Sequence, residues 1–222
     1  MEKSDTINYV IDFDSTFTQV EALDELAIIS LQNAPDKEKA QKEIKDITDL
    51  AMGGELSFRE SLLGRLKILK AHRDHIPKLI SVLKTKVSPS FVRNKEYIHS
   101  NSDRIFIISN GFKEFICPVV EEYGIPKENV YANNFSFDEE GNVDGFDSDN
   151  ILSGDTGKPA VVKSMNLSGK VHVIGDGYTD YEIRKFGMAE RFYAFTENVS
   201  RQKVVECADI VAASLDEIIN QN

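Results

Sequence analysis

The chain has 222 residues, of which 26 are Lys or Arg and 37 are Asp or Glu, giving a net charge of −11. This acidic balance argues against nucleic acid or an anionic membrane as partner, because both carry negative charge themselves. No apolar run approaches the roughly 20 residues of a membrane span, no segment of signal type opens the chain, and there are only two cysteines. We therefore expect a cytoplasmic globular protein, built as one large domain or as a domain with an insert.

The first predicted strand, Tyr9–Phe13, carries Asp12 near its end, and Asp14 follows two positions later. Side chains at i and i+2 of a strand point the same way, so both acids can meet at its carboxyl end, where open α/β sheets bind ligands. One carboxylate could attack a phosphorus centre as nucleophile while the other handles the proton. The alternative is an ordinary turn after a buried strand.

Between about residues 19 and 86 the sequence shows helical patterns only. Apolar residues in Ala40–Ala51 recur at helical spacing, and we expect this helix to stop at Gly53 and the glycine after it. The segment Ser57–Glu60 has the Ser-x-x-Glu form of a capping box and opens another helix. These signals predict a helical insert after the first strand, forming a lid over the site at that strand's end.

Further apolar runs alternate with helical patterns, which is typical of a parallel sheet with helices on both faces. The predicted strands are Arg104–Ile108, Val171–Ile174, Arg191–Phe195 and Ile210–Ala213. The segment Phe135–Phe146 instead predicts a β-hairpin whose loop contains glycine.

Two segments after the insert could bind an anion. Ser109–Gly111 follows the strand Arg104–Ile108 and precedes a predicted helix, Phe112–Tyr123, so its hydroxyl and backbone N–H groups suit phosphate oxygens. A simple serine N-cap would explain the same pattern. Lys158 stands just before Pro159, the expected first residue of another helix. A cation opposes the dipole there, so its position is easier to explain if it serves an anion.

The segment Gly175–Asp180 follows the next predicted strand and contributes Asp176 and Asp180 at a strand-to-helix turn. Together with Asp12 and Asp14 these residues would place four acids around one point. Such a cluster is costly without a cation, and oxygen ligands of this kind suit Mg²⁺. The alternative is a turn with an N-cap aspartate.

The chemical motifs, taken in order, resemble the four motifs of the haloacid dehalogenase superfamily. They are Asp12–Thr16, Ser109–Gly111, Lys158 and Gly175–Asp180. Other segments are similar to the phosphoserine phosphatases within that superfamily: Glu21, Asp24–Ala27, Ala51–Gly54, Phe58, Arg65 and Asn198–Val204. The resemblance implies a Rossmann-like α/β core domain, residues 1–18 and 87–222, with a helical cap domain inserted at 19–86.

The resemblance also implies a role for each matching residue. Asp12 would be the nucleophile that forms an aspartyl-phosphate, and Asp14 the general acid and then base. Mg²⁺ would be held by Asp12, the backbone carbonyl of Asp14 and Asp176, with Asp180 in support. Ser109 and Lys158 would bind phosphate, Glu21 the substrate ammonium and Arg65 its carboxylate. The remaining substrate-binding residues would be Met52, Gly53, Phe58, Asn110, Gly111 and Thr179.

Elementary chemistry is consistent with these roles. A serine alkoxide is a poor leaving group and needs a proton, and neighbouring carboxylates should raise the pKa of Asp14 enough for it to hold one. Phe58 and Arg65 are two helical turns apart and share one face. A buried Arg fits a carboxylate through a bidentate pair, although a surface salt bridge is the common role of a helical Arg.

The sequence departs from the family at Asn110, where the family usually has glycine, and this bears on the substrate. Phospho-L-serine is the expected substrate, since Glu21 and Arg65 together suit an α-amino acid. The alternatives are another small phosphomonoester, such as phosphohomoserine or a phosphorylated amino alcohol, or a catalytically silent regulator that binds a phosphorylated ligand. Beyond the small-molecule substrate we expect no partner except, in a homodimer, a second copy of the chain.

Overall fold

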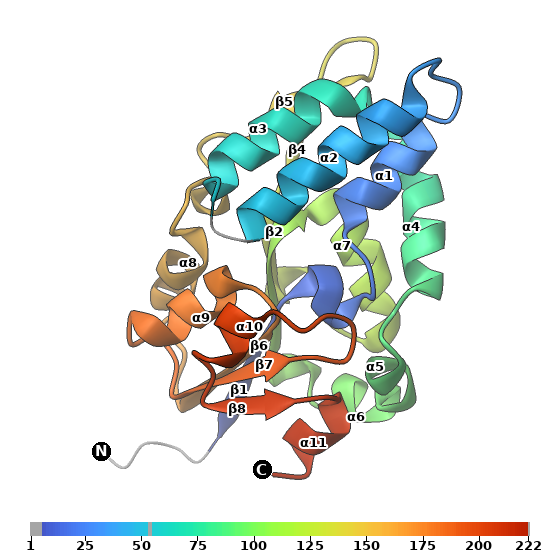
Figure 1. The fold of residues 1–222 in the computed structure, drawn as a ribbon. Helices are drawn as coiled ribbons and strands as arrows, with labels where there is room; N and C mark the ends of the chain where they lie inside the picture. The colour runs from blue at the N-terminus through green and yellow to red at the C-terminus, as the bar shows by residue number, and fades with distance from the viewer. Residues whose placement is uncertain (1–5, 53–54, 222) are drawn as a thin grey trace.

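The structure is a computed structural model that describes residues 6–52 and 55–221. Its centre is a parallel sheet in the order β3-β2-β1-β6-β7-β8 (Figure 1). The strands are β1 (Ile7–Ile11), β2 (Ile105–Phe112), β3 (Val130–Asn133), β6 (Lys170–Gly175), β7 (Arg191–Phe195) and β8 (Ile210–Ala212). The strand order reverses at β1, which pairs with β2 on one side and β6 on the other. This confirms the predicted Rossmann-like α/β fold.

Helices cover both faces of the sheet. The side chains of strand β1 point alternately to the two faces, since Tyr9 and Ile11 belong to one apolar cluster and Val10 belongs to another. The helices are α1 (Ala22–Ser30), α2 (Lys37–Met52), α3 (Phe58–Leu69), α4 (Ile76–Thr85), α5 (Pro89–Arg93), α6 (Lys95–Ser100), α7 (Lys113–Val120), α8 (Gly157–Met165), α9 (Tyr178–Lys185), α10 (Gln202–Val205) and α11 (Leu215–Ile219). None of these helices is both long and apolar enough to cross a membrane.

The strands predicted from apolar runs are all present, with shifted ends, and the predicted hairpin is formed by β4 (Phe135–Phe137) and β5 (Val143–Phe146). Strand β3 was not predicted, because four residues between two loops give no clear alternation. Strand β2 continues to Phe112 instead of ending at Ile108, and α7 begins at Lys113. Pro159 is the third residue of α8, not its first.

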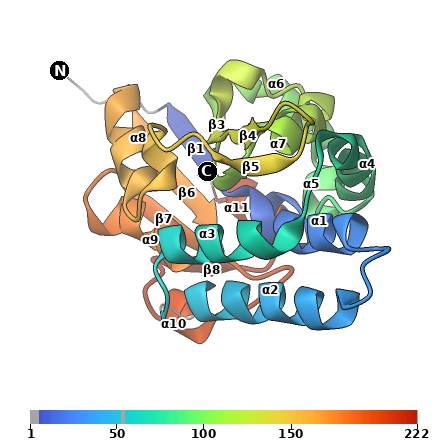
Figure 2. The same ribbon diagram turned by 90° about the horizontal axis from the view of Figure 1, so that it is seen from above.

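Helices α2 and α3 of the insert lie side by side above the sheet (Figures 1 and 2). The capping box at the start of α3 is formed as predicted. Glu60 N donates to Ser57 Oγ at 3.3 Å, and Ser57 N donates to a Glu60 carboxylate oxygen at 3.2 Å. Helix α2 extends to Met52, and the expected stop at Gly53 lies outside the described residues.

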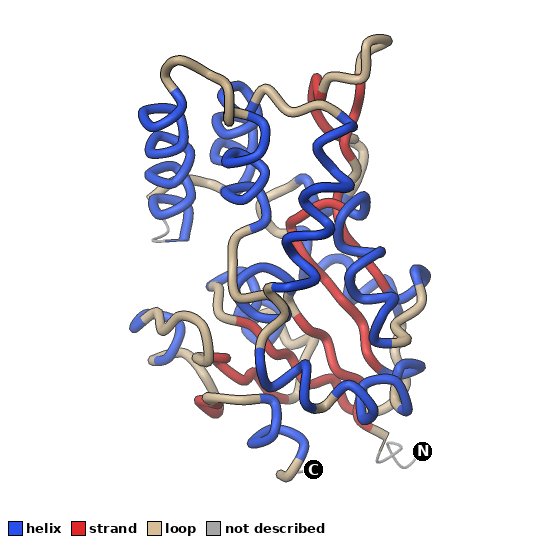
Figure 3. Tube along the Cα trace, turned by 90° about the vertical axis from the view of Figure 1, so that its right-hand side faces the viewer, coloured by secondary structure: helices blue, strands red, loops and turns tan. Residues whose placement is uncertain are grey.

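The two ends of the insert run together. Gln19 N donates to Lys86 O at 2.8 Å, and Thr18 pairs with Val87. Near the later end, Val143 N of the hairpin donates to Ala71 O at 2.9 Å, so this part of the insert is fastened to the hairpin (Figure 3). The chain thus leaves the core domain near residue 19 and returns to it near residue 86 at neighbouring points. This agrees with a cap inserted at 19–86, and those boundaries stay a prediction.

Candidate active site

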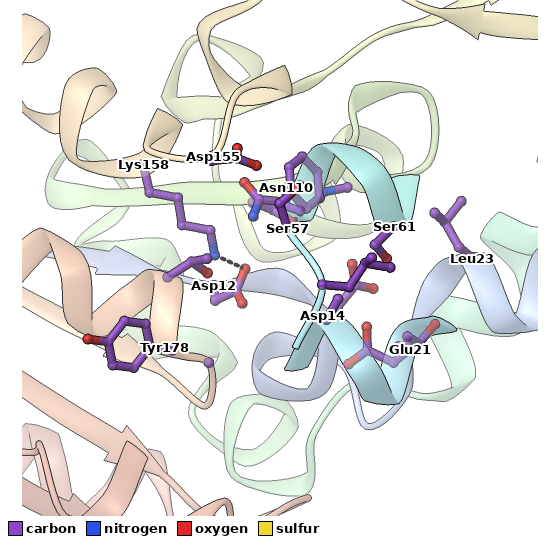
Figure 4. Close-up of a pocket in the computed structure, with 18 of the residues that line it drawn as sticks. Asp12, Asp14, Glu21, Leu23, Ser57, Ser61, Asn110, Asp155, Lys158 and Tyr178 are labelled. Carbon is purple, nitrogen blue, oxygen red and sulfur yellow. Dashed lines mark hydrogen bonds and ion pairs between the residues drawn. The ribbon is translucent and has the colours of Figure 1, made fainter. Parts of the chain in front are cut away.

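A cavity of about 290 Å³ lies between the carboxyl ends of the strands and the helical insert (Figure 4). Residues from both parts line it, among them nearly every expected site residue. These are Asp12, Asp14, Glu21, Phe58, Arg65, Ser109, Asn110, Gly111, Lys158, Asp176 and Thr179. Asp180 lies behind this wall, in contact with Lys158. The expected pocket residue Gly53 falls outside the described residues, and of Met52 only the backbone, at the end of α2, is described.

A sharp turn, Phe13–Phe17, follows β1 and brings both acids to the cavity. Ser15 has φ 55°, a left-handed conformation that is uncommon for a residue with a side chain. The turn is held in place, since Ser15 Oγ donates to Glu21 Oε1 at 2.7 Å and the side-chain amide of Asn198 donates to Ser15 O at 3.1 Å. Several separate contacts thus stabilise the backbone that aims Asp12 and Asp14.

Asp14 is in a setting that favours its protonated form. Its Oδ1 accepts the backbone N–H of Ala22 at 2.8 Å, a contact that favours the charged form. Burial opposes this and raises the pKa of Asp14 well above its ordinary value, with further increases from Glu21 and Asp12. The expected rise is present, but burial contributes more to it than the neighbouring carboxylates do. Asp14 therefore holds a proton more readily than an ordinary aspartate does.

Lys158 is the second residue of α8 and is buried beside two acids. Its Nζ lies 2.9 Å from Asp12 Oδ1 and 2.7 Å from Asp180 Oδ1. Burial by itself would lower the pKa of Lys158, but the carboxylates of Asp12 and Asp180 raise it above its ordinary value. The lysine therefore stays charged and orients Asp12.

Three carboxylates form a cluster that could hold a metal ion. One oxygen each from Asp12, Asp176 and Asp180 lie within 4.8 Å of one another. Burial and the nearby Asp12 raise the pKa of Asp180 to about 7. A Cβ at Gly175 would lie only 2.3 Å from Cγ of Asp180, so the glycine lets this acid pack against the strand end. An all-oxygen set in which Asp176 and Asp180 are buried and Asp12 is half-buried suits a hard divalent cation.

The segment Ser109–Gly111 also lines the cavity. It belongs to the irregular end of β2, where the pairing with β3 shifts, and not to the N-terminus of α7 as expected. Gly111 N donates to Ser109 Oγ at 3.0 Å. A Cβ at Gly111 would lie 3.2 Å from Asp14 Oδ2, so the missing side chain allows the strand to approach Asp14. The carbonyl of Asn110 is held by the Asn133 amide at 2.9 Å.

Arg65 of α3 enters the cavity from the insert and is only 7% exposed. Its Nη1 donates to Thr48 Oγ1 at 3.5 Å, while its Nε has no hydrogen-bond partner among the described residues. Burial lowers the pKa of Arg65, and the nearby acids Glu21, Asp24 and Asp14 oppose that shift. Its guanidinium therefore stays charged and has donor capacity left for a ligand.

Two residues that contact the site acids, Thr16 and Arg201, received no role in the sequence analysis. Thr16 Oγ1 donates to Asp176 Oδ1 at 2.7 Å. Arg201 forms an ion pair with Asp176 and lies 3.7 Å from Glu21 Oε1. Thr16 stands inside the first motif and Arg201 inside the C-terminal segment that resembles the family, but no spacing indicates their partners.

Comparison with known proteins gives consistent results. Residues 9–184 match the family described as haloacid dehalogenase-like hydrolase. Over 212 residues the chain is 32% identical to the chloroplastic phosphoserine phosphatase of Arabidopsis thaliana, covering 94% of this chain and 69% of that protein. A phosphoserine phosphohydrolase-like protein from Francisella tularensis has a similar crystal structure, with a TM-score of 0.86, 30% identity and coverage of 97% of this chain and 99% of that one. A phospho-aspartyl intermediate analogue of phosphoserine phosphatase gives a TM-score of 0.76 at 25% identity over 99% of each chain.

Proposed function

Because the chain belongs to the haloacid dehalogenase-like hydrolases and, within them, to the phosphoserine phosphatase family, we propose that it hydrolyses phospho-L-serine to L-serine and phosphate. The observation that carries this assignment is the buried guanidinium of Arg65, whose Nε has no partner among the described residues. It faces the same cavity as the carboxylate of Glu21. A substrate with both a carboxylate and an ammonium group fits this pair of opposite charges.

In the first step, Asp12 acts as the nucleophile. Its carboxylate attacks phosphorus, a bond forms between Asp12 and the phosphoryl group, and the bond from phosphorus to the seryl oxygen breaks. Asp14 gives its proton to that oxygen, so L-serine leaves as a neutral alcohol at its side chain. The raised pKa of Asp14 supports this role, since the group must carry a proton when the substrate arrives.

In the second step, Asp14 acts as the base. It takes a proton from a water molecule whose oxygen attacks phosphorus, and the bond between Asp12 and phosphorus breaks. Inorganic phosphate leaves, Asp12 is restored as a carboxylate and Asp14 is again protonated. Ser109 and Lys158 bind the phosphoryl oxygens through both steps, with Gly111 and Thr179 beside them.

Asp12, the backbone carbonyl of Asp14 and Asp176, with Asp180 in support, would hold the cation of this reaction, which would be Mg²⁺. When bound, it supplies positive charge to the transferring phosphoryl group. The oxygen-only cluster of Asp12, Asp176 and Asp180 supports this assignment.

The helical insert selects the amino-acid part of the substrate. Glu21 binds the ammonium group and Arg65 the carboxylate, while Phe58 lines the same cavity. The pocket roles of Met52 and Gly53 stay predictions from the family resemblance. In this proposal residues 19–86 act as a cap that excludes water from the site. A cytoplasmic location, and the choice between a monomer and a homodimer, remain predictions from the sequence.

The test is a phosphate-release panel with purified protein and Mg²⁺. It contains phospho-L-serine, phosphohomoserine, which is one methylene longer, and phosphoethanolamine, which lacks the carboxylate. The highest kcat/KM is expected for phospho-L-serine. A higher kcat/KM for phosphohomoserine or phosphoethanolamine would make that compound the substrate in place of phospho-L-serine. No phosphate release from any of the three compounds would favour a catalytically silent regulator.

A further inference from the structure

Ser61 lies on α3 one turn before Arg65 and lines the same cavity. Its side chain is fully buried, with 0% exposure, and its Oγ has no hydrogen-bond partner among the described residues. Figure 4 draws Ser61 above Asp14 and beside Leu23. A buried hydroxyl without a partner is unfavourable, so this position calls for an explanation.

The ordinary partner of a helical serine does not satisfy this hydroxyl. In a helix, Ser Oγ commonly donates to the carbonyl four residues earlier. Here the carbonyl of Ser57 accepts the backbone N–H of Ser61 at 3.0 Å, and no bond to Ser61 Oγ is formed. The hydroxyl is therefore free to serve a group inside the cavity.

Carboxylates of the protein nearby already accept other donors. Asp14 accepts the backbone N–H of Ala22, and Glu21 accepts the Ser15 hydroxyl. Among the described residues of α3, Ser61 Oγ and Arg65 Nε are buried donor atoms without a hydrogen-bond partner. Residues four apart share one face of a helix, so both can reach one acceptor group.

We propose that the Ser61 hydroxyl is a second donor to the substrate carboxylate and a specificity-determining group of this enzyme. The inference rests on the proposed function and deepens it. Arg65 neutralises the carboxylate, and Ser61 Oγ–H binds one of its oxygens and fixes its orientation. Thr48 holds Nη1 of Arg65, so the guanidinium keeps the edge that bears Nε for the ligand.

The experiment compares Ser61→Ala with the wild type on phospho-L-serine and phosphoethanolamine. For phospho-L-serine, kcat/KM is expected to fall on the order of tenfold, mainly through KM, because a donor to a charged group is lost. The loss with phosphoethanolamine should be much smaller, since that substrate has no carboxylate. Ser81→Ala, which removes an exposed hydroxyl on α4, is the control and should change neither value.

A double-mutant cycle adds a readout that a merely structural role would not give. In an Arg65→Ala background the carboxylate is no longer oriented, so Ser61→Ala should then cost far less than in the wild type. Equal losses on both substrates, or no loss on either, would overturn the role of Ser61. If the wild type itself fails to prefer phospho-L-serine, it is the proposed substrate that falls.

Discussion

The Nζ atom of Lys158 lies 2.9 Å from Oδ1 of Asp12, so the cation of α8 is paired with the carboxylate that follows β1. Both side chains are largely withdrawn from bulk water, and their attraction is screened little by solvent. The pair holds Asp12 in one orientation while its other oxygen stays available at the cavity. This relationship joins two motifs that are far apart in the sequence.

Asp12→Asn is expected to lower phosphate release from phospho-L-serine by at least about a thousandfold, because an amide cannot form the aspartyl-phosphate. Phosphate release in Mg²⁺ measures this, and circular dichroism checks that the variant is folded. Asp36→Asn, at an exposed position of the insert, serves as the control. Substantial turnover by Asp12→Asn would exclude covalent catalysis through this residue.

Lys158→Met should reduce both activity and stability. The change leaves Asp12 and Asp180 without their shared cation, and breaking a buried ion pair from one side costs about 3–5 kcal/mol. Urea unfolding of the metal-free protein measures the free energy of unfolding. Lys163→Met, at an exposed position of the same helix, should leave both properties unchanged. Equal stability of the two variants would contradict the structural role of the pair.

The stability of the metal-free protein should depend on Asp180. Burial and Asp12 raise the pKa of Asp180 from 3.8 to about 7. The folded state then holds this proton more tightly than the unfolded chain, so the stabilisation is full below about pH 4 and is lost as the pH rises towards 7. In chelator, Tm of the wild type should therefore fall more between about pH 5 and 7.5 than Tm of Asp180→Asn. Parallel profiles for the two proteins would refute this linkage.

Added Mg²⁺ should raise Tm of the wild type more at about pH 7.5 than at pH 5, because the cation competes with protons for the cluster of Asp12, Asp176 and Asp180. Thermal melts with Mg²⁺ and with chelator measure the difference. A gain that is independent of pH would place the cation elsewhere.

Arg65→Ala should separate the two substrates that differ in a carboxylate. Loss of a charge-assisted pair in a closed site costs about 1.5–3 kcal/mol, which is roughly ten- to a hundredfold in kcat/KM for phospho-L-serine. The value for phosphoethanolamine should change little. Lys67→Ala removes an exposed cation from the same helix and is the matched control. A similar loss of kcat/KM on both substrates would show that Arg65 does not bind the substrate carboxylate.

Asn110→Gly tests the departure from the family. The hydrogen bond that the side-chain amide of Asn133 donates to the backbone carbonyl of Asn110 survives the change, so only the side chain at the cavity is removed. For an enzyme adapted to phospho-L-serine, kcat/KM for this substrate is expected not to rise. A clear rise in the kinetic assay would indicate that the pocket is shaped for a different phosphomonoester.

The sequence by itself determined five of the six strands described for the parallel sheet, the hairpin and the catalytic motifs. Strand β1 and the pair of Asp12 and Asp14 were predictable because residue alternation and strand-end acids are local patterns. The capping box at Ser57 was predictable for the same reason, since Glu60 is only three residues away. Each of these features depends on neighbours in the chain, and such neighbours can be read without knowing the fold.

Only the tertiary structure decided which groups have partners. Strand β3 forms through its pairing with β2, and Arg201 joins the site through its ion pair with Asp176. In both cases the partners are distant in sequence. The free donors of Ser61 and Arg65 are likewise a property of burial, because an exposed helix would have left both in water. Hydrogen-bond satisfaction and desolvation depend on everything that surrounds a group in space, and that surrounding is fixed only when the chain has packed.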